Sequence, residues 1–163
     1  MIMANDVLEH LHESPRVVLN KLLTGLSVGG FLFVTVPNLA NIRKRLSLLR
    51  GRTNLAAYDL YYWYEGPWRG PVREYVRGDM ESLCENLGLE KVQLGTVHHM
   101  LQNLPGYAHK PYKGVTRLFP DWRDTWVLVA RKPAGWKAKT EISDDEFSRI
   151  YGQKSRGMLH AEQ

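Results

Sequence analysis

The segment that most constrains the fold is the uninterrupted apolar run from Phe31 to Val36, which follows Gly29-Gly30 and ends at Pro37-Asn38. The run lacks the alternation of apolar and polar residues that marks a strand with one solvent-exposed face. The glycines before it and the proline after it also leave it too short for a helix. A run of this kind is typical of a parallel strand that helices cover on both faces. We therefore expect a layered sheet with this strand inside it.

Helical and strand-like patterns alternate around this run. Ser14-Pro15 is a helix-start signal, and the leucines that follow it at helical spacing predict a helix ending before Gly29-Gly30. Apolar residues at helical spacing also predict helices over residues 39–49 and 79–87. The remaining expected strands cover residues 1–4, 91–97 and 125–130, and residues 98–124 are expected to be loop-rich. This alternation with short connections favours an α/β fold.

The domain organisation follows from the same patterns. Residues 1–133 form one domain, within which residues 53–71 are an aromatic lid or insert. The aromatic side chains of that insert either stack on a ring of the substrate, such as a sugar or a quinone, or cover the core. Residues 134–163 form a polar tail, either disordered or holding one short helix at 144–151.

Composition excludes several classes of protein. No stretch approaches the roughly 20 apolar residues of a membrane span, and no signal peptide precedes the first strand, so the cytoplasm is the expected location. The formal net charge is +5, with a basic stretch from Arg43 to Arg52. We interpret this stretch as a solvated helix face rather than a nucleic-acid footprint, because no nucleic-acid-binding motif accompanies it. An anionic substrate or a lipid surface is the alternative partner.

Candidate chemistry lies where the first two strands end, because ligands of open α/β sheets bind at the carboxyl ends of the strands. Asp6, Glu9 and His10 have the spacing i, i+3, i+4, so a helical turn would place them on one face. Two carboxylates and an imidazole suit a divalent cation such as Mg²⁺. Without a metal, His10 could act as a general base. A third interpretation is structural, in which the acids begin a helix and His10 packs the loop.

Several short motifs, in this order and spacing, resemble the second half of a class I S-adenosylmethionine-dependent methyltransferase. The matching residues are Asp6-Val7-Leu8-Glu9-His10-Leu11, Pro15, Leu22, Leu26, Gly29-Gly30, Val34-Thr35-Val36-Pro37-Asn38, Arg73-Glu74-Tyr75 and Leu87-Gly88-Leu89. The resemblance spans roughly residues 2–131. Within this family, the motifs are most similar to those of the branch that includes ubiquinone-pathway O-methyltransferases and enzymes of bacterial surface-polysaccharide gene clusters.

The resemblance implies a partial Rossmann-like methyltransferase sheet of about four strands flanked by helices. These strands would be the fourth, the fifth and the last two of the family's seven, and residues 125–130 would run antiparallel. The N-terminal cofactor-binding half would be lacking, since no G-x-G-x-G sequence occurs among the 163 residues. The chain would then be a C-terminal half only.

The resemblance also implies roles for single residues. The cofactor is S-adenosylmethionine, with Ala4, Asn5 and Asp6 bordering its methionine part. The family's E-x-x-E-H motif, implicated in metal binding, corresponds to Asp6, Glu9 and His10, and a bound metal such as Mg²⁺ would activate a substrate hydroxyl. The residues expected on the substrate side are Asn38, Arg73 and Tyr75.

Two functions follow as expectations. The first is an enzyme that transfers a methyl group to an oxygen of a small molecule, a lipid or a glycan, with His10 and Glu9 as its catalytic residues. The second is a truncated, methyltransferase-like remnant without catalysis, which binds a partner or has no function. In that case the first strand would expose an unpaired edge through which the chain could pair with another strand.

Overall fold

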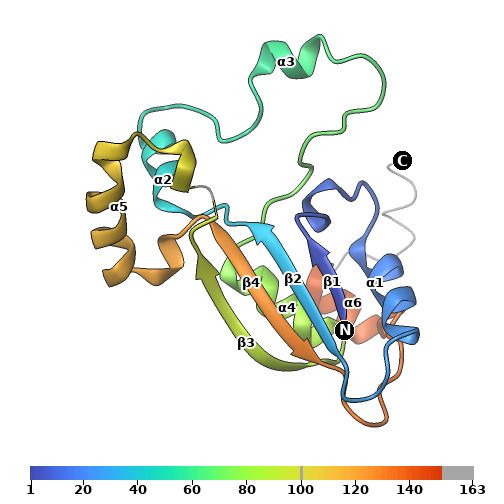
Figure 1. Ribbon diagram of the computed structural model, residues 1–163. Coiled ribbons are helices and arrows are strands. Elements are labelled where there is room, and N and C mark those ends of the chain that lie inside the picture. The colour runs from blue at the N-terminus through green and yellow to red at the C-terminus, as the bar shows by residue number, and fades with distance from the viewer. Residues whose placement is uncertain (100, 152–163) are drawn as a thin grey trace.

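The computed structural model describes residues 1–99 and 101–151 and contains a mixed four-stranded sheet (Figure 1). The strands are β1 (Ile2–Asn5), β2 (Phe31–Pro37), β3 (Glu90–Val97) and β4 (Thr125–Arg131), in the order β1-β2-β4-β3. β1 is parallel to β2, whereas β4 is antiparallel to both β2 and β3. The four predicted strands are confirmed, as is the antiparallel direction of the last one.

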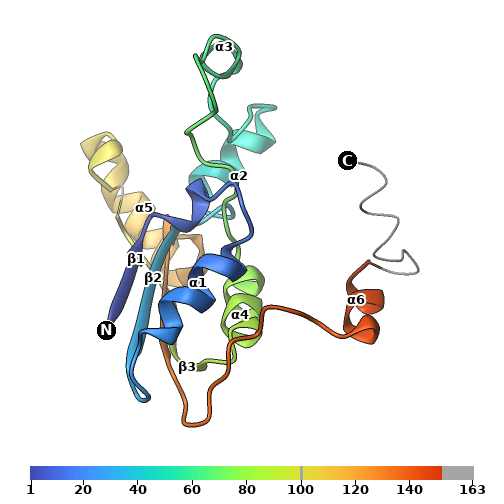
Figure 2. The same cartoon turned by 90° about the vertical axis from the view of Figure 1, so that its right-hand side faces the viewer.

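Two helices cover one face of the sheet: α1 (Pro15–Thr24) and α4 (Arg77–Asn86) (Figure 2). As expected, the Ser14 hydroxyl caps α1 by accepting a hydrogen bond from the amide of Arg16. The fully buried side chains of this core come from both helices and from the sheet. They include Leu19, Leu23, Met80, Leu32, Val34, Val36, Leu128 and Ala130.

The opposite face of the sheet lacks a helical layer within the described part of the chain. Burial alternates along β2, where Leu32, Val34 and Val36 are fully buried but Phe31 is 40% exposed. The expectation that helices cover both faces of this strand is therefore wrong for one face. An apolar run shows that a strand suits burial on both sides, but whether a second layer exists depends on other segments.

The segment from residue 42 to residue 71, which we call the arch, rises away from the sheet in both views (Figures 1 and 2). It contains α2 (Ile42–Leu49) and α3 (Tyr58–Tyr62), and no residue of either helix is buried. Leu46 and Leu49, which belong to the apolar stripe of the predicted helix over residues 39–49, are 43% and 83% exposed. The stripe has the spacing of an amphipathic helix, yet within the described chain none of its residues is buried.

The region between β3 and β4 was expected to be loop-rich, and this prediction is wrong. It contains a thirteen-residue helix, α5 (Gly106–Leu118), between the short 3₁₀ turns η2 (Leu101–Asn103) and η3 (Pro120–Trp122). Pro111 lies inside α5 and removes one backbone donor, which hid the helix from pattern analysis. The helix forms because Tyr112 and Thr116, one turn apart, are both buried.

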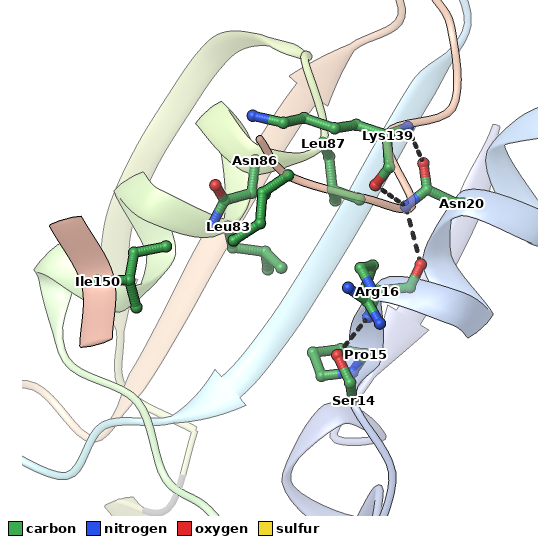
Figure 3. Close-up of a pocket in the computed structure, with 10 residues that line it drawn as sticks. Ser14, Pro15, Arg16, Asn20, Leu83, Asn86, Leu87, Lys139 and Ile150 are labelled. Atoms are coloured by element: carbon green, nitrogen blue, oxygen red, sulfur yellow. Dashed lines mark hydrogen bonds between the residues drawn. The ribbon is translucent and has the colours of Figure 1, made fainter. Parts of the chain in front are cut away.

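The C-terminal segment after residue 133 contacts α1 and α4. The Trp136 indole donates to the Leu87 carbonyl at 2.7 Å, and the Asn20 side chain bonds both main-chain groups of Lys139 (Figure 3). The predicted helix at 144–151 is present as α6 (Asp144–Tyr151). Residues 152–163 of the expected tail lie outside the described residues. None of the helices described here combines the length and apolar character that a membrane span requires.

Candidate functional site

The chain turns sharply where β1 ends, beside the end of β2. Asp6 adopts a left-handed conformation with φ 50°, which Asp tolerates better than most residues. Its amide donates to the Thr35 carbonyl at 2.9 Å, and the Thr35 hydroxyl donates to its carboxylate at 3.4 Å. These bonds fix the turn at the carboxyl edge of the two parallel strands, where sequence reasoning placed the chemistry.

Glu9 lies in the 3₁₀ turn η1 (Leu8–His10) and is only 2% exposed. Its main-chain carbonyl accepts from the Val72 and Arg73 amides, and its Oε2 has no hydrogen-bond partner among the described residues. Burial raises the pKa of the Glu9 carboxyl, and the nearby Asp6 carboxylate raises it further, against the lowering effects of a backbone hydrogen bond and His10. A buried carboxyl oxygen without a hydrogen-bond partner lowers the stability of the fold, so its presence calls for a functional explanation.

His10 points the other way and is exposed. Its Nδ1 lies 3.2 Å from the Arg69 carbonyl. Because a carbonyl oxygen can only accept, Nδ1 carries the proton of this bond, and in the neutral imidazole Nε2 is then the acceptor. The arch therefore sets the tautomer of His10 through the main chain of Arg69.

The three residues of the predicted metal set do not share one face. Asp6 precedes the 3₁₀ turn in a left-handed conformation, Glu9 is buried and His10 is exposed. Across residues 1–99 and 101–151, no three His, Cys, Asp or Glu side chains gather as ligands of one metal ion. The i, i+3, i+4 spacing would align them only on a continuous α-helix, which this segment does not form.

Of the two other residues expected against the cofactor, Ala4 is buried in the core and Asn5 is exposed. Both lie in β1, directly before the Asp6 turn. Their backbone belongs to the β1–β2 ladder, in which Ala4 is opposite Val34 and Asn5 is opposite Thr35. The structure thus places them at the expected edge of the sheet.

Asn38 is fully buried, and both ends of its amide are occupied within the protein. Its Nδ2 donates to the Asp121 and Arg123 carbonyls, each at 2.7 Å, and its Oδ1 accepts from the Ala40 amide at 2.9 Å. These bonds join the end of β2 to the segment that leads into β4. The described contacts of Asn38 are those of a residue that positions the site.

Arg73 and Tyr75 directly follow the arch and hold this part of the chain against η1. The Tyr75 side chain is 5% exposed and its hydroxyl donates to the Leu8 carbonyl at 3.3 Å. Burial raises the pKa of Tyr75, which the Arg73 guanidinium partly opposes. Arg73 pairs with Asp79 at 3.0 Å and lies 5.8 Å from the centre of the Tyr75 ring. Tyr75 and Asn38 also form an isolated parallel bridge.

A polar cleft of about 530 Å³ opens at this edge of the sheet. Two basic side chains of α2, Arg43 and Lys44, line it together with the carboxylates of Glu74 and Asp124. Lys44 and Glu74 form an ion pair across it. Pro71, next to the residue that bonds the Glu9 carbonyl, also lines the cleft and connects it to the β1 turn.

Asp124 is a residue of this cleft that sequence reasoning missed. It is 7% exposed, and its Oδ1 accepts from the His99 amide at 2.7 Å and the Thr125 hydroxyl at 3.0 Å. The Tyr112 hydroxyl donates to its Oδ2 at 3.4 Å, and burial with the nearby carboxylate raises the pKa of Tyr112 to about 12. Because β4 is antiparallel to its neighbours, its first residue lies beside the carboxyl ends of the other strands. The expectation of an antiparallel strand at residues 125–130 could therefore have pointed to Asp124, the residue directly before it.

A second cavity, of about 220 Å³, lies between α1, α4 and the C-terminal segment (Figure 3). Leu83, Leu87 and Ile150 give it an apolar wall, and Ser14 and Asn20 border it. Its lining contains no residue of the β1 turn or of the polar cleft. We therefore place the candidate chemistry at the β1 turn and the neighbouring polar cleft, whose lining does not include Asp6, Glu9 or His10.

Comparison with known proteins assigns no family to the chain. No protein-family model matches the chain, and no curated protein matches it. Among solved structures, it is similar to a DUF574 family protein from Streptomyces avermitilis MA-4680, at 18% sequence identity and a TM-score of 0.47. The similarity covers 80% of this chain and 43% of that one, so the chain spans less than half of its neighbour's length. The described residues form an α/β unit with a mixed four-stranded sheet, compatible with a partial Rossmann-like fold.

Proposed function

We propose that the chain acts as an S-adenosylmethionine-dependent methyltransferase that methylates an oxygen of a small-molecule, lipid or glycan acceptor. The observation that carries the proposal is the environment of His10. The imidazole lies at the carboxyl end of two parallel strands, and its Nδ1 is bonded to the Arg69 carbonyl. This arrangement leaves Nε2 exposed as a proton acceptor beside the turn that corresponds to the methyltransferase motif.

His10 would act as the general base. Imidazole suits proton transfer near neutral pH, and a base whose second nitrogen is held by a carbonyl is fixed in one tautomer. Nε2 would take up the proton of the acceptor hydroxyl, whose oxygen would receive the methyl group as the methyl–sulfur bond of the cofactor breaks and S-adenosylhomocysteine leaves. Glu9, buried directly before His10, would position the imidazole through its main chain, whose carbonyl accepts from the Val72 and Arg73 amides.

The residues at the β1 turn fit the methionine part of the cofactor. S-adenosylmethionine, when bound, supplies an electrophilic methyl group. The left-handed turn at Asp6 presents main-chain groups at the strand ends, and the unpartnered Oε2 of Glu9 is a buried polar atom that a ligand could satisfy. Backbone groups of Ala4, Asn5 and Asp6 would border the cofactor. No G-x-G-x-G sequence is present to cradle the rest of it.

The same residues do not favour the metal-dependent alternative. The Asp6 carboxylate accepts from the Thr35 hydroxyl, and Glu9 and His10 lie on opposite sides of η1, one buried and one exposed. A hard cation such as Mg²⁺ needs several oxygen ligands converging on one point.

Calorimetry with S-adenosylmethionine tests the proposal on the chain itself. We expect a dissociation constant below about 1 mM, which corresponds to about 4 kcal/mol of binding free energy. His10→Ala should retain this binding and abolish transfer of a labelled methyl group to extracted lipids and glycans. His12→Ala, a neighbouring exposed histidine, is the matched control and should retain both. Absence of S-adenosylmethionine binding at millimolar concentration would overturn the proposal.

The second candidate is a non-catalytic binding module that pairs through β1. Within the described residues β1 has one neighbour, β2, and Met3 on it is 55% exposed. A free strand edge is a template for another strand. Light scattering would then show self-association that Met3→Lys abolishes, in a protein that does not bind S-adenosylmethionine. A chain that stays monomeric would contradict self-pairing.

A further inference from the structure

The arch, residues 42–71, exposes large apolar and aromatic side chains over much of its length. Leu49 is 83% exposed, Leu55 is 79% exposed and Trp63 is 76% exposed. Single exposed apolar residues are ordinary, but a continuous segment of them on a projecting element marks an interaction site. The arch projects from the body of the protein in both views (Figures 1 and 2). Its side chains are therefore accessible to a large partner.

The aromatic residues of the arch contact one another rather than the core. Tyr62 lies 4.9 Å from Trp63, ring centre to ring centre, in an edge-to-face arrangement, and Tyr58 lies 5.9 Å from Tyr62. All three remain more than half exposed. This overturns the interpretation in which the aromatic insert covers the core. The rings form a small cluster at the outer end of the arch, beside α3.

The arch is also strongly basic. It contains six Lys and Arg residues and two Asp and Glu residues, a net charge of +4, against +5 for the whole chain. Arg50, Arg52 and Arg69 have no ion-pair partner among the described residues. The positive charge of the protein is thus concentrated on the segment that exposes leucine and aromatic side chains.

We propose that the arch is a docking surface for an anionic lipid bilayer. Trp and Tyr rings reside at the level of lipid headgroups, leucine side chains insert into the acyl boundary, and Arg side chains attract anionic headgroups. Nucleic acid would engage the arginines and the rings but would leave Leu48, Leu49 and Leu55 exposed to water. Of these two partners, only the bilayer uses all three kinds of side chain.

The position of the arch relates this surface to the polar cleft. The arch leaves the sheet directly after Asn41 and returns at Pro71, both of which line the cleft. A bilayer that contacts the outer arch therefore lies on the side of the molecule where the cleft opens. If the proposed methyltransferase function holds, the acceptor would be a lipid or lipid-linked molecule. The docking surface itself does not depend on that function.

Sedimentation with vesicles tests the proposal directly. The full chain should bind vesicles of phosphatidylcholine with phosphatidylglycerol, bind weakly to phosphatidylcholine alone, and dissociate as salt is raised. Arg50→Glu with Arg52→Glu should weaken binding to the anionic vesicles by at least about 30-fold, since each basic residue contributes roughly a factor of five. Leu49→Ser with Trp63→Ser should weaken it by at least about tenfold at the same net charge.

The matched control is Lys110→Glu with Arg117→Glu, which makes the same change of charge on exposed residues of α5. It should bind nearly as the unaltered chain does, and circular dichroism should show every variant folded. Absence of binding to anionic vesicles at low salt would overturn the proposal. Equal losses of vesicle binding in the control and arch variants would also overturn it. The same holds if the chain binds a single-stranded RNA oligonucleotide but does not bind vesicles.

Discussion

Replacing Lys132 tests how the C-terminal segment secures the core beneath the candidate site. Lys132 follows β4 and is 8% exposed. Its ammonium group donates to the Leu23 and Leu26 carbonyls, each at 2.7 Å, at the C-terminal end of α1. It also lies 4.4 Å from the centre of the Trp136 ring. The cation thus ties the last strand, α1 and residue 136 together.

The expected loss for Lys132→Met follows from these contacts. Hydrogen bonds from a charged donor contribute about 1.5 to 3 kcal/mol each, and a cation at a helix C-terminus adds about 0.3 to 1 kcal/mol. Desolvation of the ammonium offsets part of this, and methionine preserves the packing of the aliphatic stem. We expect the free energy of unfolding to fall by about 2 to 4 kcal/mol, a large part of the stability of a domain this size.

Urea unfolding followed by circular dichroism measures the effect. With an m-value of about 2 kcal/mol per M, the midpoint should fall by about 1 to 2 M with the slope unchanged. Lys137→Met removes the same charge from an exposed position and should shift the midpoint by less than about 0.3 M. Equal midpoints for the two variants would refute the view that the Lys132 ammonium stabilises the end of α1.

Three further outcomes are expected. Burial raises the pKa of Glu9 above 4.5, so the folded state binds the Glu9 proton more tightly than the unfolded state does. The stabilisation that this proton gives the fold is complete below pH 4.5 and declines as pH rises through the folded pKa. Glu9→Gln should remove this decline from the pH dependence of the thermal midpoint. Asn38→Ala leaves two partly buried carbonyls unpaired and should lower the free energy of unfolding by about 2 to 4 kcal/mol, unlike Asn5→Ala at an exposed position. Trp136→Phe removes the 2.7 Å bond to the Leu87 carbonyl, costs about 1 kcal/mol and should speed proteolysis after residue 132; unchanged cleavage would contradict the anchoring role of the indole.

Local sequence signals predicted most of the secondary structure, because they act over a few residues. Ser14-Pro15 begins α1, and the apolar run at 31–36 is β2. The helix α5 escaped prediction because Pro111 contradicts the pattern locally, while burial of Tyr112 and Thr116 against the rest of the protein outweighs that cost. Tertiary packing commonly overrides a weak local preference in this way.

The candidate site was likewise predictable only in part from the sequence. By itself the sequence determined where the polar turn follows β1, and that the turn carries Asp6, Glu9 and His10. Only the tertiary structure decided that Glu9 is buried and His10 exposed, because the left-handed Asp6 and the amides returning from the arch set the directions of these side chains. The antiparallel direction of β4 brings Asp124 to the cleft, and within the described chain no residue of α2 is buried. Spacing along a chain fixes which residues are neighbours in a turn; which of them meets water depends on the segments that fold against it from far away in the sequence.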